Sequence, residues 1–258
     1  QSSRIGRDDE EKGNDVKDWN GKRYWLVGAS EGLGRSVAEV MSRAGVEVIV
    51  SARSEDRLKE LVADLPGKAS YVTVDVSDRE SVEAAAKEVG EIDGVVFLAG
   101  IYWPMKVHEW DIQKAETMAD VNFTGAFRVV GSVIGDMLEK DKGHIVLTGS
   151  LSGFRGLPGT VGYGASKAGV MYLAESMHAD LRGTGVKVQV VNPGFIKTRL
   201  TEKNDFTMPF IMEPEEAAKE FFEHMNDDSF KKSFPMLFSW FFRVSQFLPD
   251  WLYYRIFA

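Results

Sequence analysis

The sequence predicts an α/β protein whose doubly wound parallel sheet carries helices on both faces. Short apolar runs rich in β-branched residues alternate with helical segments from residue 22 onward. The runs are apolar nearly throughout, which is typical of parallel strands covered by helices on both sides. A glycine-rich turn joins the first run to the first helical segment. These three observations together indicate strands and helices in regular alternation.

The individual elements follow from residue type and spacing. β-Branched and apolar content predicts strands at residues 24–27, 46–50, 71–74, 92–98, 144–147 and 186–191. Helical spacing predicts helices at residues 34–44, 54–65, 78–89, 121–140 and 163–181. Gly45 and the Pro66-Gly67 pair are placed as helix stops. Pro214 occupies the tolerated first turn of a further helix.

The chain is interpreted as one domain behind a polar tail. Residues 1–20 are expected to be disordered, because the charged run at residues 7–12 offers nothing to bury. Residues 21–258 contain neither an internal repeat nor a linker. One hydrophobic core can support a domain of this size.

Composition excludes several classes of protein. The net charge of −8 and the lack of a basic stripe argue against nucleic-acid binding. The absence of cysteine excludes disulfides and thiolate metal sites, and the four scattered histidines predict no metal site. No charge-free stretch exceeds the twelve residues 94–105, too short to span a bilayer. With no apolar signal segment near its start, the chain is expected to be cytoplasmic.

The turn after the first strand has the composition of a phosphate-binding loop. It consists of Gly28, Ala29, Ser30, Glu31, Gly32, Leu33 and Gly34. Its glycines let the backbone approach a pyrophosphate, and the helix that follows presents free N–H groups to the anion. This position predicts a Rossmann-like nucleotide-binding fold. The alternative is a strand–helix turn that binds no ligand.

The end of the second strand bears on the choice of cofactor. Many NAD-dependent enzymes place an acid there to bind the ribose 2′-hydroxyl. This chain has Arg53 instead, which can hold a 2′-phosphate through charge-assisted hydrogen bonds and so favours NADP(H). Glu31 adds an opposing negative charge that Arg35 can offset. The alternative for Arg53 is a solvated charge at a helix start.

Acid–base chemistry is suggested by a group of three residues that follow the fifth predicted strand. Tyr163 and Lys167 are four apart at the start of a helix and share a face. An ammonium beside a phenol is expected to lower the pKa of the phenol, which can then exchange a proton with a carbonyl or alcohol oxygen. Ser150 lies where such sheets open their ligand crevices, and its hydroxyl can hold the same oxygen. The alternative is a surface pair without function.

These motifs resemble the short-chain dehydrogenase/reductase family, in its compact single-domain branch. The resemblance covers residues 22–225 and includes the thirteen-residue interval from Ser150 to Tyr163. The matching positions are the loop glycines, the adenine-side pair Asp75 and Val76, Ala99 and Gly100 after the fourth strand, the tetrad Asn122, Ser150, Tyr163 and Lys167, and the nicotinamide-side residues Pro193, Gly194, Ile196 and Thr198.

The resemblance implies roles for these residues. Tyr163 is expected to be the proton donor or acceptor, Lys167 to tune it and bind the nicotinamide ribose, and Ser150 to position the substrate oxygen. Asn122 is expected to hold a water in a proton relay through Lys167. Thr198 occupies the place that binds the carboxamide. The resemblance also implies a homodimer or homotetramer paired through the helices that carry Asn122 and Tyr163.

Two positions depart from the family pattern. Val27 stands where the family usually has threonine, and Phe97-Leu98 replaces an Asn-Asn pair before Ala99. Both changes remove polar side chains that normally brace the central sheet. They are interpreted as altered scaffolding near the cofactor, because the tetrad is intact.

The segments around the predicted site are apolar. Residues 195–212 are expected to form a lid, and residues 101–105 an opposing strip. Together they suggest an apolar ketone or secondary alcohol as substrate, although these side chains can equally pack the lid. A nucleotide sensor or scaffold of the same fold is the alternative from a different class, and a lipid-active reductase at a membrane surface is a third hypothesis.

The C-terminal segment 234–258 is rich in aromatic residues. It holds ten of the 29 aromatic residues of the chain, and Pro249 is expected to divide it into two short amphipathic helices. Three interpretations are open. The segment can wall the pocket, bury against a partner subunit, or lie in a membrane interface as a peripheral contact.

Overall fold

The computed structural model of the protein describes residues 18–257, and it contains one seven-stranded sheet. All strand pairs are parallel, in the order β3-β2-β1-β4-β5-β6-β7. The strands are β1 (Arg23–Val27), β2 (Glu47–Ala52), β3 (Ala69–Thr73), β4 (Gly94–Phe97), β5 (Gly143–Thr148), β6 (Val186–Pro193) and β7 (Lys231–Phe234). The predicted fold class is therefore confirmed.

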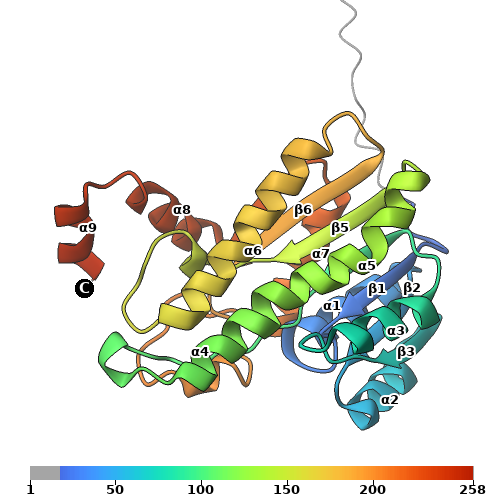
Figure 1. Cartoon of the computed structure of the whole chain (residues 1–258), viewed down its shortest axis with the longest axis horizontal. Helices are drawn as coiled ribbons and strands as arrows, with labels where there is room; N and C mark the ends of the chain where they lie inside the picture. The colour runs from blue at the N-terminus through green and yellow to red at the C-terminus, as the bar shows by residue number, and fades with distance from the viewer. Residues whose placement is uncertain (1–17, 258) are drawn as a thin grey trace, which may run out of the picture.

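Helices cover both faces of this sheet (Figure 1). They are α1 (Gly32–Arg43), α2 (Glu55–Asp64), α3 (Arg79–Val89), α4 (Ile112–Ala119), α5 (Gly125–Glu139), α6 (Val161–Asp180), α7 (Pro214–Asn226), α8 (Met236–Ser245) and α9 (Asp250–Phe257). Helices α1, α2 and α7 contribute to the apolar core on one face, and α3, α5 and α6 to the core on the other. Two helices divided at Pro249 were expected at the C-terminal end, and α8 and α9 confirm them.

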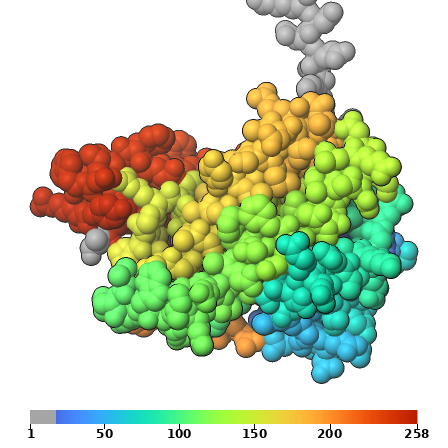
Figure 2. Space-filling model, in the orientation of Figure 1, coloured from blue at the N-terminus to red at the C-terminus, as the bar shows by residue number. Residues whose placement is uncertain are grey.

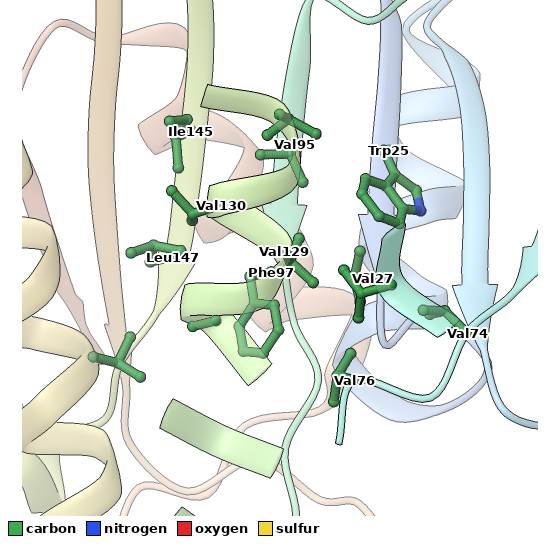
Figure 3. Close-up of a cluster of buried hydrophobic side chains, with 14 of the residues drawn as sticks. Trp25, Val27, Val74, Val76, Val95, Phe97, Val129, Val130, Ile145 and Leu147 are labelled. Carbon is green, nitrogen blue, oxygen red and sulfur yellow. The ribbon is translucent and has the colours of Figure 1, made fainter. Parts of the chain in front are cut away.

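The core on the α5 face explains the two departures from the family pattern. Figure 3 shows Val27 of β1 and Phe97 of β4 among the apolar side chains that lie beside Val129 of α5. Both Val27 and Phe97 are fully buried. The backbone of Leu98 still donates to the carbonyl of Val27, at 2.7 Å. Apolar packing thus surrounds the strand ends where the family usually has polar side chains.

Three elements differ from the sequence prediction. Strand β7 was missed because the sequence Lys231-Lys232-Ser233 has no apolar run, although it pairs with β6. Helix α4 was also missed, and a π-helical turn (Asp120–Thr124) joins it to α5, so the helix predicted at residues 121–140 begins earlier. Strand β4 is shorter than the predicted 92–98 because the chain leaves the sheet at Leu98.

The packed part of the chain begins before residue 21, which is earlier than predicted. Residues 1–17 lie outside the described part of the chain, but Trp19 is buried. Its ring packs against Tyr24 and Phe222, and its indole N–H donates to Asn226 of α7. The packed part of the chain therefore includes residue 19, because a large aromatic side chain there finds both apolar and polar partners.

Candidate active site

The predicted site residues lie around one cleft at the carboxyl ends of the strands. Its volume is about 890 Å³, within the range of small-molecule sites. The cleft runs from Arg53 and Asp75 at one end, past the loop between β1 and α1, to Tyr163 and Lys167 at the other. Every residue assigned to cofactor binding or catalysis lines it, except Asn122. Residues distant in the sequence thus meet because parallel strands end at one edge.

The glycines of the loop allow close backbone contacts. Gly28 has a φ of +94°, and a Cβ added there would lie 2.3 Å from the backbone nitrogen of Ala99. A Cβ on Gly34 would lie 2.1 Å from the carbonyl oxygen of Gly28. A Cβ on Gly32 would meet the methyl group of Thr198 at 2.9 Å. The loop is therefore pressed against both β4 and the segment after β6.

The backbone N–H groups at the start of helix α1 donate to no capping side chain of the described residues and are free to bind an anion. No side chain caps its N-terminus, and its first turn carries no acidic residue. The first N–H groups of a helix lack partners within the helix, and its dipole favours an anion there. This end of α1, facing the cleft, has the chemistry of a pyrophosphate site.

We predict that Gly34→Ala destabilises the protein and disrupts this loop. The new methyl group meets backbone atoms rather than a movable side chain, so the expected loss in unfolding free energy is about 1–3 kcal/mol. Thermal unfolding measures it. Gly131→Ala in α5 is the matched control, because no atom lies within 4 Å of its added Cβ. Equal unfolding temperatures for the two variants would contradict the prediction.

Toward the Arg53 end of the cleft, two arginines neutralise Glu31. Its carboxylate accepts hydrogen bonds from Arg57 and Arg199, each at 2.7 Å. Arg35, expected to offset Glu31, instead bonds to Asp64 at 2.6 Å and lies near Glu39. The expectation for Arg35 is therefore wrong, because its side chain points along α1 and toward α2. The sequence analysis missed Arg57 and Arg199, although Arg57 lies one helical turn after Arg53.

Arg53 and Asp75 lie near each other at the same end of the cleft. Arg53 is exposed and forms no ion pair within the described residues. Burial raises the pKa of Asp75, but hydrogen bonds from the hydroxyl and backbone of Ser77 and the charges of Arg53 and Arg128 outweigh it, so the pKa is lowered overall. Asp75 is thus held in its negatively charged form, whereas the guanidinium of Arg53 can still bind an anionic group of a ligand.

The catalytic candidates meet at the other end of the cleft. Ser150 follows β5 and accepts a hydrogen bond from the backbone of Ser152. Tyr163 and Lys167 lie one turn apart on α6. The ammonium of Lys167 is buried and donates to the carbonyl oxygen of Thr148 at 2.9 Å, while its nitrogen lies 5.8 Å from the centre of the Tyr163 ring. The predicted shared face of Tyr163 and Lys167 is therefore present.

The pKa of Tyr163 differs from the sequence prediction. Burial raises this pKa to about 12, and the nearby Ser150 hydroxyl lowers it only in part. Burial also lowers the pKa of Lys167 to about 8. The predicted lowering of the Tyr163 pKa is therefore wrong for this structure, because burial of the phenol raises its pKa and the neighbouring Tyr102 raises it further. At neutral pH the phenol carries its proton.

Asn122 lies beside the cleft and connects two of its walls. Its side chain is fully buried in the π-helical turn. Its amide oxygen accepts from the backbone N–H of Ile101 at 2.7 Å, and its amide nitrogen donates to the carbonyl of Ile101 and the hydroxyl of Ser166, each at 3.0 Å. Asn122 thus fixes the loop after β4 against α6, the helix that carries Tyr163 and Lys167.

Tyr102 joins the strip after β4 to the predicted lid. Its ring meets the ring of Tyr163 edge-on at 4.9 Å, and its hydroxyl donates to the side chain of Asn204 at 2.9 Å. The ammonium of Lys203 donates to the Tyr102 carbonyl at 2.7 Å. The roles of Asn204 and Lys203 were missed, since no local pattern predicts contacts a hundred residues apart.

We predict that Tyr102→Phe loosens the lid without unfolding the protein. The change removes one hydrogen bond to Asn204 and keeps the ring contact with Tyr163. Hydrogen–deuterium exchange of residues 196–212 should become several-fold faster. Tyr172→Phe is the matched control, because Tyr172 is an exposed tyrosine of α6. Unchanged exchange in Tyr102→Phe would show that the Asn204 contact does not hold the lid.

Aromatic side chains connect the lid to helix α8. Phe238 of α8 contacts Phe195 and Phe210, with ring centres 5.8 and 5.6 Å apart. It also lies against Gly194, where an added Cβ would be 3.2 Å from its ring. Phe210 adopts a positive φ of 56°, which is uncommon for a bulky residue. The inner face of α8 therefore supports the lid, whereas its outer face is exposed.

The described residues, 18–257, offer neither a cluster suited to a metal ion nor a membrane-spanning helix. Within this range, no group of three or more acidic or histidine side chains has a metal-binding arrangement. None of the helices in the same range is long and apolar enough to cross a bilayer.

Comparison with known proteins identifies the family. The pattern of the short chain dehydrogenase family matches residues 22–208. An uncharacterized oxidoreductase of Myxococcus xanthus is 36% identical over 237 residues, covering 88% of this chain and 93% of that protein. A 3-oxoacyl-(acyl-carrier-protein) reductase of Thermotoga maritima is 35% identical over 195 residues, covering 71% of this chain and 77% of that protein.

Solved structures agree. An actinorhodin polyketide ketoreductase with NADPH has a TM-score of 0.74 at 26% identity, covering 81% of this chain and 90% of that one. A short chain dehydrogenase/reductase family protein has a TM-score of 0.78 at 26% identity, covering 84% and 96%. The chain belongs to the short-chain dehydrogenase family and is an oxidoreductase. The resemblance inferred from the motifs is confirmed.

Proposed function

We propose that the protein interconverts a ketone and a secondary alcohol on an apolar substrate, with NADP(H) as cofactor and Tyr163 as the general acid or base. The observation that carries this proposal is the meeting of Ser150, Tyr163 and Lys167 at one end of a cleft whose other end presents Arg53. The ketoreductase among the structural neighbours and the reductase among the relatives support the reaction class.

The residues of the cleft fit a nicotinamide dinucleotide. The uncapped start of α1 and the loop Gly28 to Gly34 suit its pyrophosphate, and Asp75 and Val76 lie where the adenine side would be held. Pro193, Gly194, Ile196 and Thr198 would hold the nicotinamide side, together with Ala99 and Gly100. When bound, the cofactor supplies or accepts the hydride.

The protein groups supply orientation and the proton. In the reductive direction, the Tyr163 hydroxyl donates its proton to the carbonyl oxygen while Ser150 holds the same oxygen in place. The pKa of about 12 keeps this proton on Tyr163 at neutral pH, so the phenol is ready to act as an acid. Lys167 places a buried cation near the phenolate that forms, which stabilises its negative charge. Asn122 holds the loop and the helix that frame these groups.

The charges at the adenine end support NADP(H) over NAD(H). Two arginines already pair with Glu31, so its carboxylate no longer opposes a phosphate at full strength. Arg53 is exposed at the cleft with no acidic ion-pair partner among residues 18–257. An arginine in this position can bind a phosphate through two parallel hydrogen bonds.

A thermal-shift titration with NADPH and NADH tests the cofactor proposal. A ligand that binds only the folded state stabilises it by about 2.7 kcal/mol at a hundredfold excess over Kd. We expect NADPH to act at a much lower concentration than NADH. Stabilisation by NADH at the lower concentration would reject the preference for NADP(H), and no shift with either would reject the oxidoreductase cofactor site itself. The cytoplasmic location and the homodimer or homotetramer stay predictions.

A further inference from the structure

The C-terminal helices expose an unusual amount of apolar surface. Within residues 18–257, nine of the eighteen exposed large apolar side chains belong to α8, α9 and the turn between them. These nine are Met236, Leu237, Trp240, Phe241, Val244, Phe247, Trp251, Tyr254 and Ile256. Phe247, in the turn, is 89% exposed. We call this set the apolar ridge. Exposed apolar side chains concentrated in one segment in this way mark an interaction site.

The apolar ridge projects from one end of the molecule. Figure 1 shows α8 and α9 extending beyond the sheet, and Figure 2 shows them as a separate lobe at that end. The segment that precedes α4 lies toward the same end (Figure 1) and exposes Val107 and Trp110, and the first residue of α4, Ile112, is exposed as well. Two segments with exposed apolar side chains therefore lie toward the same end of the molecule in this view.

Arg155 holds the ridge in a defined position. Its guanidinium donates to the carbonyl oxygens of Ser245 and Leu248 at 3.1 and 2.7 Å and pairs with Asp250. It also lies 4.0 Å from the centre of the buried Tyr253 ring, whose hydroxyl donates to a carbonyl in the loop after β5. These polar contacts thus attach α8 and α9 to the rest of the domain while the apolar side chains of the ridge remain exposed.

The charges and aromatic types of the ridge favour a lipid surface. In residues 236–257 the single acid, Asp250, is paired with Arg155, whereas Arg255 is exposed and forms no ion pair among the described residues. Arg243 is half-buried and donates to the hydroxyl of Ser233 at 3.4 Å. The ridge therefore presents one exposed cation without an acidic partner, Arg255, on a chain with net charge −8. Tryptophan and tyrosine, present here as Trp240, Trp251 and Tyr254, are the residues that membrane interfaces favour.

We propose that α8, α9 and their connecting turn dock the protein on the surface of an anionic phospholipid bilayer. Exposed apolar side chains would enter the acyl boundary, and Arg255 would meet lipid phosphates. The inner face of α8 contacts the lid through Phe238, so the docked surface lies next to the lid of the cleft. The docking does not depend on the proposed reaction, because it involves no cofactor and no catalytic residue.

Vesicle binding by the full chain tests this proposal. We expect the protein to co-sediment with vesicles of phosphatidylcholine and phosphatidylglycerol, with a blue shift of tryptophan emission, and much less with phosphatidylcholine alone. The double variant Leu237→Ser/Phe247→Ser should lower the partition coefficient at least about tenfold. Arg255→Gln should lower it about fivefold, on anionic vesicles only.

The controls separate docking from folding and from self-association. Leu138→Ser/Tyr172→Ser removes two exposed apolar side chains from α5 and α6 and should leave binding unchanged. Thermal unfolding of each variant checks that the fold is intact. The proposal is overturned if the parent protein fails to bind anionic vesicles. It is also overturned if Leu237→Ser/Phe247→Ser leaves binding intact, or if this variant only lowers the oligomeric mass measured by sedimentation, which would assign the ridge to a second copy of the chain.

Discussion

Replacement of Tyr163 by phenylalanine is expected to reduce NADPH-dependent ketone reduction by about a thousandfold. The variant keeps the ring and its edge-on contact with Tyr102 at 4.9 Å, but it loses the hydroxyl that we propose as the proton donor. Loss of a positioned general acid typically costs about 10²–10⁴ in rate. The measurement is the loss of NADPH absorbance with a panel of apolar ketones, for the parent and for Tyr163→Phe.

Cofactor binding distinguishes a chemical defect from a structural one. Tyr163→Phe should still be stabilised by NADPH in a thermal-shift assay, because the adenine end of the cleft is unchanged. Tyr172→Phe, on the outer face of the same helix, should retain full activity. Turnover in Tyr163→Phe within a few-fold of the parent would remove Tyr163 from the mechanism. A parent protein that binds NADPH but reduces no ketone in the panel would favour a sensor or scaffold.

The second large effect is expected at Arg53. Arg53→Ala should weaken NADPH binding about 10- to 100-fold while NADH binding changes less than about twofold. The reason is that a charge-assisted hydrogen bond contributes about 1.5–3 kcal/mol, and only NADPH carries the 2′-phosphate. Calorimetric titration of the parent and of Arg53→Ala with NADPH and with NADH measures the dissociation constant of each cofactor.

Arg43→Ala is the matched control for this experiment. Arg43 lies in the last turn of α1, away from the cleft, and its nearest acid is Glu39 at 3.9 Å. It should leave both affinities unchanged. An equal loss for NADPH and NADH in Arg53→Ala would mean that Arg53 contacts a group that both cofactors share. No loss for either would assign the 2′-phosphate to Arg57 or Arg199, which the structure places at the same end of the cleft.

The sequence predicted the central sheet and the cleft residues well because both depend on local patterns. Six of the strands are apolar runs, and the glycine loop, Ser150 and the Tyr163–Lys167 pair are recognisable from spacing alone. Strand β7 has no such pattern, since Lys231 and Lys232 lie at the sheet edge and pair with acids of α6 and α7. Its position is set by pairing with β6, a contact that no local pattern contains.

The electrostatics of the cleft were less predictable than its composition. The partners of Glu31 come from α2 and from the segment after β6, so Arg35, its near neighbour in sequence, was the wrong choice. The pKa of Tyr163 depends on burial by surrounding segments, and spacing reports only the nearby Lys167. Both errors arise from tertiary structure, because the local sequence gives which charges are adjacent in the chain, but not which distant groups the fold brings to them or how deeply it buries them.

Asn122 has a consequence for the thermodynamics of turnover. Its three hydrogen bonds tie the loop after β4 to α6 and are satisfied within the protein itself. The conformational entropy of these two walls is therefore lost when the chain folds, and not again each time a substrate binds. In the proposed reaction, ordering of these two walls should therefore add no unfavourable entropy to the activation free energy of hydride transfer.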